Sequence, residues 1–191
     1  MVRVVGGALG GRRLETAGAD AVRPTSDRAR EAIFNMLVGL ELPGGAMVLD
    51  LFAGSGALGI EALSRDAAHA TFVDSDAAAC RTISTNLTAL GISDRATVVR
   101  SDAGRFLAAH SEPVDLAFAD PPYRFDRWSD LLDTVNAGVL VCESDREIEP
   151  GSNHAWQTHR SRRYGTPVIT ILLRSDSTDS SAAGASPSRQ A

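Results

Sequence analysis

Residues 50–59 read Asp-Leu-Phe-Ala-Gly-Ser-Gly-Ala-Leu-Gly. The apolar run 46–51 ends inside this stretch, and a helical pattern follows it to about residue 65. Gly54, Gly56 and Gly59 have the spacing found where a strand turns into a helix at a dinucleotide site. Glycine is needed there because the backbone bends sharply and a ligand must approach without a Cβ in the way. By itself, the spacing also fits an ordinary structural turn.

Strand-like and helix-like segments alternate after this turn. We expect further strands at 68–74, 96–100, 114–119 and 139–142, and helices at 76–90, 103–109 and 128–136. This alternation predicts an α/β fold, in which a mostly parallel sheet has right-handed crossovers and helices on both faces. Segments 155–163 and 166–173 favour a hairpin-like pair that completes the sheet in antiparallel orientation.

The two ends of the chain differ from this core. Segments 3–9 and 12–16 flank Gly10-Gly11, which predicts a β-hairpin extension, and Ser26 or Thr25 is expected to cap a helix that runs through Leu37. The last residues are mostly Ser, Ala, Asp and Gly, so we expect disorder there. The predicted division is a hairpin arm over 1–24, the main domain over 25–174 and a disordered tail over 175–191.

Composition limits the class of protein. The chain has 191 residues, 43% of them hydrophobic and 23% charged, which indicates one globular domain rather than a disordered chain. No apolar stretch approaches the ~18 residues of a membrane span. The start lacks a secretory signal, so we expect a cytoplasmic protein without membrane contact. Cys80, Cys142 and the histidines lack metal-ligand spacing, so no metal is expected, and the absence of lysine excludes Schiff-base chemistry.

Charge is distributed unevenly along the chain. Residues 1–30 hold six arginines against three acids, residues 31–150 hold eight against nineteen, and residues 151–191 hold five against two. Basic ends around an acidic middle indicate that a polyanion could bind at the ends. Ordinary surface scatter of charge is the alternative.

Three acids stand at or near the carboxyl ends of predicted core strands. Asp74 lies twenty residues after Gly54, where a carboxylate can accept hydrogen bonds from both ribose hydroxyls of an adenosine. Asp50 would repel a pyrophosphate but attract the ammonium and sulfonium groups of S-adenosylmethionine. Asp102 can reach the adenine amine. Each acid alone could be a helix cap, but three over one crevice favour S-adenosylmethionine over NAD.

The sequence Asp120-Pro-Pro-Tyr123 follows the fourth predicted core strand. Proline lacks an N–H group, so the carbonyls of this turn face a pocket only as acceptors. The Asp120 carboxylate and the Pro121 carbonyl could accept both N–H groups of an exocyclic amine on a base that stacks on Tyr123. A rigid turn with a surface tyrosine is the alternative.

The predicted site therefore has two sets of residues. Those expected to act in catalysis are Asp120, Pro121 and Tyr123. Those expected to bind the cofactor are Asp50, Phe52, Ala53, Gly54, Gly56, Asp74, Ser75, Asp102, Ala103 and Asp120.

The glycine loop and the tetrapeptide together resemble class I S-adenosylmethionine-dependent methyltransferases that act on exocyclic amines. Four further motifs resemble the RsmD family of 16S rRNA guanine-N2 methyltransferases, namely Arg3-Val-Val-Gly-Gly7, Gly11-Arg-Arg-Leu14, Arg23-Pro-Thr-Ser-Asp-Arg-Ala-Arg-Glu-Ala-Ile-Phe-Asn35 and Gly56-Ala-Leu-Gly-Ile-Glu-Ala-Leu-Ser-Arg65. The resemblance covers residues 1–173. It implies a seven-stranded Rossmann-like sheet with a reversed last strand, an arm that engages rRNA, and a substrate presented by a small ribosomal subunit or its precursor. We expect the protein to be a monomer.

Seven of the arginines outside the acidic middle are candidates for phosphate contacts, with a solvated surface as the alternative. They are Arg3, Arg12, Arg13, Arg23, Arg160, Arg162 and Arg163. We expect that deleting residues 1–18 leaves cofactor binding nearly intact and abolishes methylation of the ribosomal substrate. Three other functions remain open at this point: a DNA adenine-N6 methyltransferase, a NAD(P)-binding oxidoreductase, and an RNA-binding assembly factor without activity.

Overall fold

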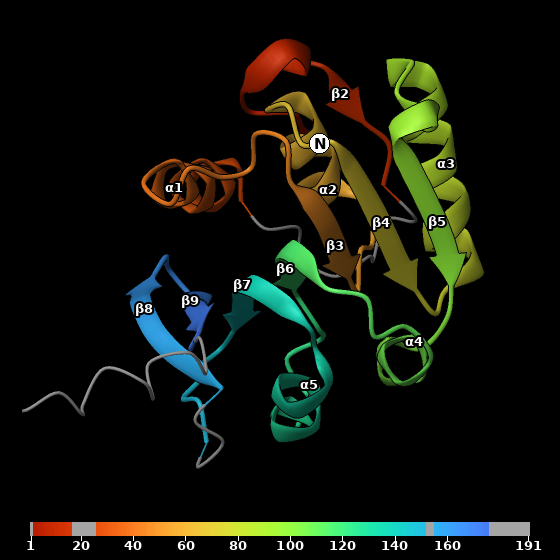
Figure 1. Cartoon of the computed structure of the whole chain (residues 1–191). Coiled ribbons are helices and arrows are strands. Elements are labelled where there is room, and N and C mark those ends of the chain that lie inside the picture. Colours follow the sequence, from red (N-terminus) through yellow and green to blue (C-terminus); the bar gives the residue numbers. More distant parts are fainter. Residues whose placement is uncertain (1, 17–25, 152–154, 176–191) are drawn as a thin grey trace, which may run out of the picture.

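The computed structural model describes residues 2–16, 26–151 and 155–175, and it contains a seven-stranded sheet (Figure 1). The strands in spatial order are β5 (Ala96–Arg100), β4 (His69–Asp74), β3 (Met47–Leu51), β6 (Val114–Ala119), β7 (Ala137–Ser144), β9 (Val168–Arg174) and β8 (Trp156–Arg163). The first five pair in parallel, and β9 pairs antiparallel with both β7 and β8. The predicted mostly parallel sheet with a reversed last strand is confirmed.

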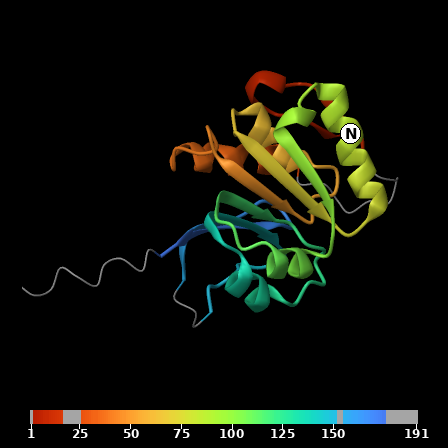
Figure 2. The ribbon, with the colours of Figure 1, turned by 45° about the vertical axis from the view of Figure 1, so that its right-hand side comes forward.

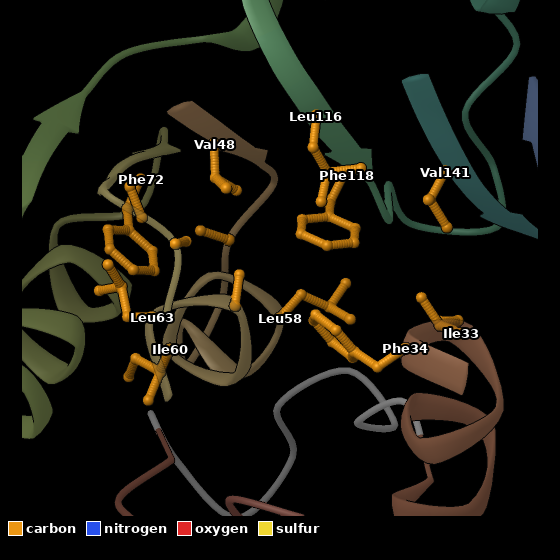
Figure 3. Close-up of a cluster of buried hydrophobic side chains, with 14 of the residues drawn as sticks. Ile33, Phe34, Val48, Leu58, Ile60, Leu63, Phe72, Leu116, Phe118 and Val141 are labelled. Atoms are coloured by element: carbon orange, nitrogen blue, oxygen red, sulfur yellow. The ribbon is translucent and has the colours of Figure 1, made fainter. Parts of the chain in front are cut away.

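Helices cover both faces of the sheet (Figures 1 and 2). One face packs against α1 (Asp27–Val38), α2 (Ala57–Ser64) and α3 (Ala77–Leu90), and the other against α4 (Ala103–Ala109) and α5 (Trp128–Thr134). Phe34 of α1 packs against Phe118 of β6 with ring centroids 5.8 Å apart, and Ile33 lies toward Val141 of β7 (Figure 3). Burying this apolar surface fixes α1 against the sheet beside α2.

The amino-terminal extension differs from its prediction. It contains the short antiparallel pair β1 (Val2–Arg3) and β2 (Arg13–Leu14), and a 3-10 turn, η1 (Gly7–Leu9), replaces the predicted continuation of the first strand. The strand is lost because its donors bond elsewhere: Glu61 accepts the N–H groups of Val5 and Gly6, and the Ser64 hydroxyl accepts that of Leu9. The hairpin is therefore present, but it is held by hydrogen bonds to α2 rather than by a long series of hydrogen bonds between its own strands.

Other boundaries shift by a few residues. Helix α5 ends at Thr134, two residues before the predicted end, and β7 begins earlier and ends later than expected. No helix within the described ranges is long and apolar enough to cross a membrane. The tail predicted to be disordered, apart from Ser175, lies outside the described residues.

Candidate active site

The order of the strands creates a crevice beside β3. The chain runs outward from β3 to β4 and β5 and then returns to the other side of β3 as β6. In open α/β sheets, ligands bind at the carboxyl ends of the strands where the order reverses in this way. The register aligns Leu51 with Val73 on one side and with Ala119 on the other. The next residues along these strands, Phe52, Asp74 and Asp120, therefore meet at one edge.

The loop after β3 has the backbone geometry that its glycines predict. Gly54 and Gly56 have φ values of 57° and 77°, in the left-handed region that favours glycine. Gly59 is required for close packing, because a Cβ there would lie 2.3 Å from the Phe72 ring. Phe52 also has a positive φ of 59°. Such strain in a non-glycine residue is concentrated at ligand sites in proteins.

Asp50 lies beneath this loop rather than in the crevice. Its side chain is 1% exposed, and one carboxylate oxygen accepts the Gly59 N–H at 2.8 Å. Burial raises the pKa of Asp50 from 3.8 to about 7, the Gly59 hydrogen bond lowers it, and the charge of Asp74 raises it. This bond fastens β3 to the first turn of α2, and the expected contact of Asp50 with the cofactor stays a prediction.

Asp74 is placed as predicted, at the end of β4 and half-buried. One of its oxygens accepts the Gly54 N–H at 2.9 Å, and the other accepts the Asp76 N–H at 2.9 Å. A carboxylate has about four acceptor positions, so both oxygens can still accept hydroxyl donors. The exposed Ser75 follows directly, and Ala53 donates its N–H to Val73, which ties the loop to β4.

Asp102 is the N-cap of α4, and Ala103, the first residue of this helix, borders a cavity of about 230 Å³. Asp102 caps the helix by accepting the Arg105 N–H at 3.1 Å, and the Arg127 guanidinium lies 3.7 Å from its second oxygen. The cavity is lined by Phe52, Ala103, Gly104, Leu107, Phe125, Arg127, Asp130, Leu131 and Thr134. Phe125 packs edge-on against Phe52, with centroids 5.3 Å apart. The sequence analysis missed Phe125 and Arg127, although both follow the tetrapeptide closely.

The tetrapeptide leaves the sheet at the same edge. Asp120 is half-buried directly after β6, Pro121 is buried, and Tyr123 is 44% exposed. Phe125 donates its N–H to the Pro122 carbonyl, which closes the turn. An exposed aromatic ring beside a half-buried carboxylate is suited to a flat ligand that carries N–H donors.

The arm (residues 2–16) is docked on the core. Glu61 is fully buried and binds the arm backbone with oxygen–nitrogen distances of 2.6 Å and 2.8 Å. Arg12 donates to the carbonyl of Ala89 near the end of α3, and Leu9 bonds Ser64 at the end of α2. Helices α2 and α3 begin near the carboxyl ends of the strands and end near the amino ends. The contacts of η1 and Arg12 therefore lie toward the amino ends, away from the crevice.

A buried asparagine connects the arm to the glycine loop. Asn86 is 2% exposed, its Oδ1 accepts the Glu15 N–H at 2.8 Å, and its Nδ2 donates to the carbonyls of Glu15 and Ser55 at 3.1 Å each. The sequence analysis missed this residue. The sequence feature that could have identified it is a polar residue on the apolar face of α3, next to Leu87 and one turn after Ile83.

The remaining basic candidates are dispersed. Arg3 is exposed and pairs with Asp27 at 2.9 Å, and Arg13 is exposed on β2. Arg160, Arg162 and Arg163 are exposed on β8. Arg23 lies outside the described residues. The structure therefore does not gather the candidate arginines into one patch, and no cluster of metal-ligating side chains occurs among the residues that it describes.

The strand order, the glycine loop and the acids that converge at the switch point define a class I methyltransferase fold of the Rossmann-like type. The family model described as conserved hypothetical protein 95 matches residues 2–173. The chain belongs to this family, and the match confirms the resemblance to RsmD.

Known relatives cover almost the whole chain. YlbH of Bacillus subtilis is 42% identical over 184 residues, which are 91% of this chain and 99% of the relative. Ribosomal RNA small subunit methyltransferase D of Escherichia coli K12 is 36% identical over 181 residues, covering 91% of this chain and 90% of the relative. A solved structure from Thermus thermophilus is 32% identical with a TM-score of 0.77, covering 92% and 100% of the two chains.

Proposed function

We propose that this protein transfers a methyl group from S-adenosylmethionine to the exocyclic N2 amine of a guanine in 16S rRNA. The observation that carries the proposal is the register that brings Asp120, at the end of β6, beside the glycine loop and Asp74. The name of the Escherichia coli relative supports the rRNA substrate. The guanine and its N2 position rest on the resemblance to the family and on the chemistry of the tetrapeptide.

The residues of the crevice fit this cofactor. A Cβ at Gly54 would meet only the Phe52 carbonyl, at 3.9 Å, so the outer side of the loop is open to a ligand. Asp74 is held by two backbone N–H groups with further acceptor capacity for ribose hydroxyls. Ala103 and Phe52 border the cavity of about 230 Å³, and the carboxylate of the adjacent Asp102 can accept from an adenine amine.

Asp50 acts on the cofactor through its charge. Its carboxylate holds the Gly59 N–H under the loop, and a cation bound above the loop favours the ionised form of Asp50 through space. We therefore assign to Asp50 an electrostatic role together with its role in fixing the loop.

S-adenosylmethionine supplies an electrophilic methyl group on a sulfonium sulfur. An exocyclic amine is a poor nucleophile because its lone pair is conjugated into the ring. The Asp120 carboxylate and the Pro121 carbonyl accept its two N–H groups, which directs the lone pair toward the cofactor side of the crevice. Tyr123, which is 44% exposed, stacks on the base. No covalent intermediate with the protein is needed.

The substrate is presented on a large RNA surface. We propose that arginines of the arm and of β8 contact phosphates of a small ribosomal subunit or its precursor. Because Arg12 lies toward the far end of the sheet, its contact would be remote from the target base. A DNA adenine-N6 methyltransferase shares the tetrapeptide, but the described residues form a single sheet domain and a short arm without a further domain for sequence readout.

The test is methylation with labelled S-adenosylmethionine of small ribosomal subunits from cells that lack this protein, followed by mapping of the modified base. We expect one labelled guanine, modified at N2. DNA serves as the competing acceptor. Label in adenine of DNA, or in no nucleic acid while the cofactor still binds, would overturn the proposal.

A further inference from the structure

A groove separates α1 from the edge strand β8, outside the crevice described above. It has a volume of about 460 Å³ and is lined by Ala32, Asn35, Met36, Gly39, His159, Arg160, Arg162 and Tyr164. The α1 residues recur at three- and four-residue spacing and therefore present one face of the helix. The described residues that line the groove include two arginines and no acid. The groove is thus a basic hollow in a chain of net charge −5.

An irregularity in β8 turns its basic side chains into this groove. The pairing of β8 with β9 shifts between Thr158 and Arg160, so one extra residue is inserted in β8. A β-bulge re-aims side chains that would otherwise alternate across the sheet. Arg160 and Arg162 then pair with Ile171 and Ile169, whose side chains belong to the core on the α1 face. Both arginines consequently share that face.

The groove also contains an aromatic surface. The Arg162 guanidinium lies over the Tyr164 ring, 5.5 Å from its centroid, and Tyr164 is half-buried against the core. Its backbone N–H bonds to the Pro167 carbonyl at 2.7 Å, which fixes the turn after β8. A guanidinium that lies over an aromatic ring forms with it a surface on which a nucleobase can stack.

The register places this groove within reach of the catalytic edge. Arg162 pairs with Ile169, which pairs with Glu143, and Glu143 follows the aligned pair Cys142 and Ala119. Arg162 therefore lies level with Asp120, three strand spacings away, which is about 14 Å along the sheet. A few nucleotides of single-stranded RNA span such a distance.

Protection of an exposed sheet edge is the other reason for charge on β8, because charged side chains prevent edge-to-edge pairing. That purpose requires no hollow and no aromatic partner. Arg163 illustrates the difference, since its guanidinium donates to the carbonyls of Thr166 at 3.0 Å and Asp145 at 3.3 Å. Arg160 and Arg162 instead line the groove.

We infer that the groove between α1 and β8 binds single-stranded RNA that flanks the target base, with Arg160 and Arg162 on phosphates and Tyr164 under a base. The inference rests on the proposed function. It adds a second nucleotide subsite that does not touch the reacting atoms. Changes there should raise KM for the RNA substrate and leave kcat almost unchanged.

The experiment compares Arg160→Ala and Arg162→Ala with Arg105→Ala, which removes the same charge from an exposed position on α4. The probe is the small ribosomal subunit lacking the modification, bound at several salt concentrations. We expect each groove variant to flatten the slope of log K against log salt by about 0.7, the value for one single-strand phosphate contact. Arg105→Ala should keep the parent slope.

A second pair of variants tests the stacking surface. Tyr164→Ala should weaken binding about 5- to 100-fold, as loss of one base stack does, and Tyr164→Phe should bind like the parent. If the parent methylates subunits and the groove variants retain its KM and salt slope, the groove is not an RNA subsite. Loss of binding to subunits with unchanged binding to naked 16S rRNA would assign the groove to a protein partner and would also overturn the inference. If the parent methylates no subunit, the proposed function itself fails.

Discussion

Asp50 combines full burial with a pKa raised from 3.8 to about 7. The unfolded chain releases this proton near pH 4 and the folded chain near pH 7, so the free energy of unfolding falls as pH rises between these values. We expect Asp50→Asn, which can still accept the Gly59 N–H, to raise the free energy of unfolding at pH 8 by up to about 4 kcal/mol. Near pH 4 the gain should be small. Urea unfolding at both pH values measures it.

The same substitution should weaken cofactor binding. Removing the carboxylate takes a negative charge from beneath the loop, so Asp50→Asn should bind S-adenosylmethionine less tightly than the parent does at pH 8. The difference should shrink at pH 6, where the parent is largely protonated. A gain in stability that is equal at pH 4 and pH 8 would show that folding does not raise the pKa of Asp50.

Asp74 carries a second prediction at this scale. Asp74→Ala removes the acceptor of the Gly54 and Asp76 N–H groups together with the proposed acceptor for ribose. We expect calorimetry to show a loss of cofactor affinity of roughly 1–3 kcal/mol. Asp76→Ala is the matched control, because Asp76 is exposed and its side chain caps α3 through Ala78. Unchanged affinity in a folded Asp74→Ala protein would remove Asp74 from the site.

Among the elements, the arm is the one whose role the structure changes most. The sequence alone indicates that its deletion spares the cofactor site. The Asn86 bridge from Glu15 to Ser55, however, joins the arm to the glycine loop. We expect Asn86→Ala to lower the free energy of unfolding by about 1–3 kcal/mol and to weaken cofactor binding measurably, because buried backbone partners lose their bonds.

A deletion of residues 1–16 should have a larger effect, since it also leaves the buried Glu61 carboxylate without the N–H groups of Val5 and Gly6. Asn136→Ala is the matched control for Asn86→Ala, because Asn136 is half-buried and donates to the Ser111 carbonyl away from the loop. Parent-like stability and cofactor affinity after the deletion would show that the arm and the loop are independent.

The core elements follow from local patterns, and the arm does not. The five parallel strands were predictable because apolar runs between turn residues specify buried strands with little help from distant residues. The strand expected over residues 3–9 fails at Gly7–Leu9 because Glu61 and Ser64, more than fifty residues away, accept its N–H groups. Nothing within residues 3–9 indicates those partners.

For the whole molecule, the convergence of Asp74, Asp102 and Asp120 was predictable because parallel strands bring their carboxyl ends to one edge. The direction of the Asp50 side chain was not, since it depends on how α2 packs on β3. Phe125 and the groove beside β8 depend similarly on contacts between distant segments and on a bulge. Sequence therefore gives the edge of the sheet at which chemistry occurs, and packing gives the pockets around it.

The central claim is that Asp120 holds the acceptor amine for methyl transfer. Single-turnover methylation of unmodified small ribosomal subunits, measured beside calorimetric cofactor affinity for the parent and Asp120→Ala, tests it most directly. We predict a rate lowered at least about 100-fold, as for other lost transition-state hydrogen bonds, with cofactor affinity and thermal unfolding close to those of the parent. A folded Asp120→Ala protein that methylates subunits at nearly the parent rate would contradict the account.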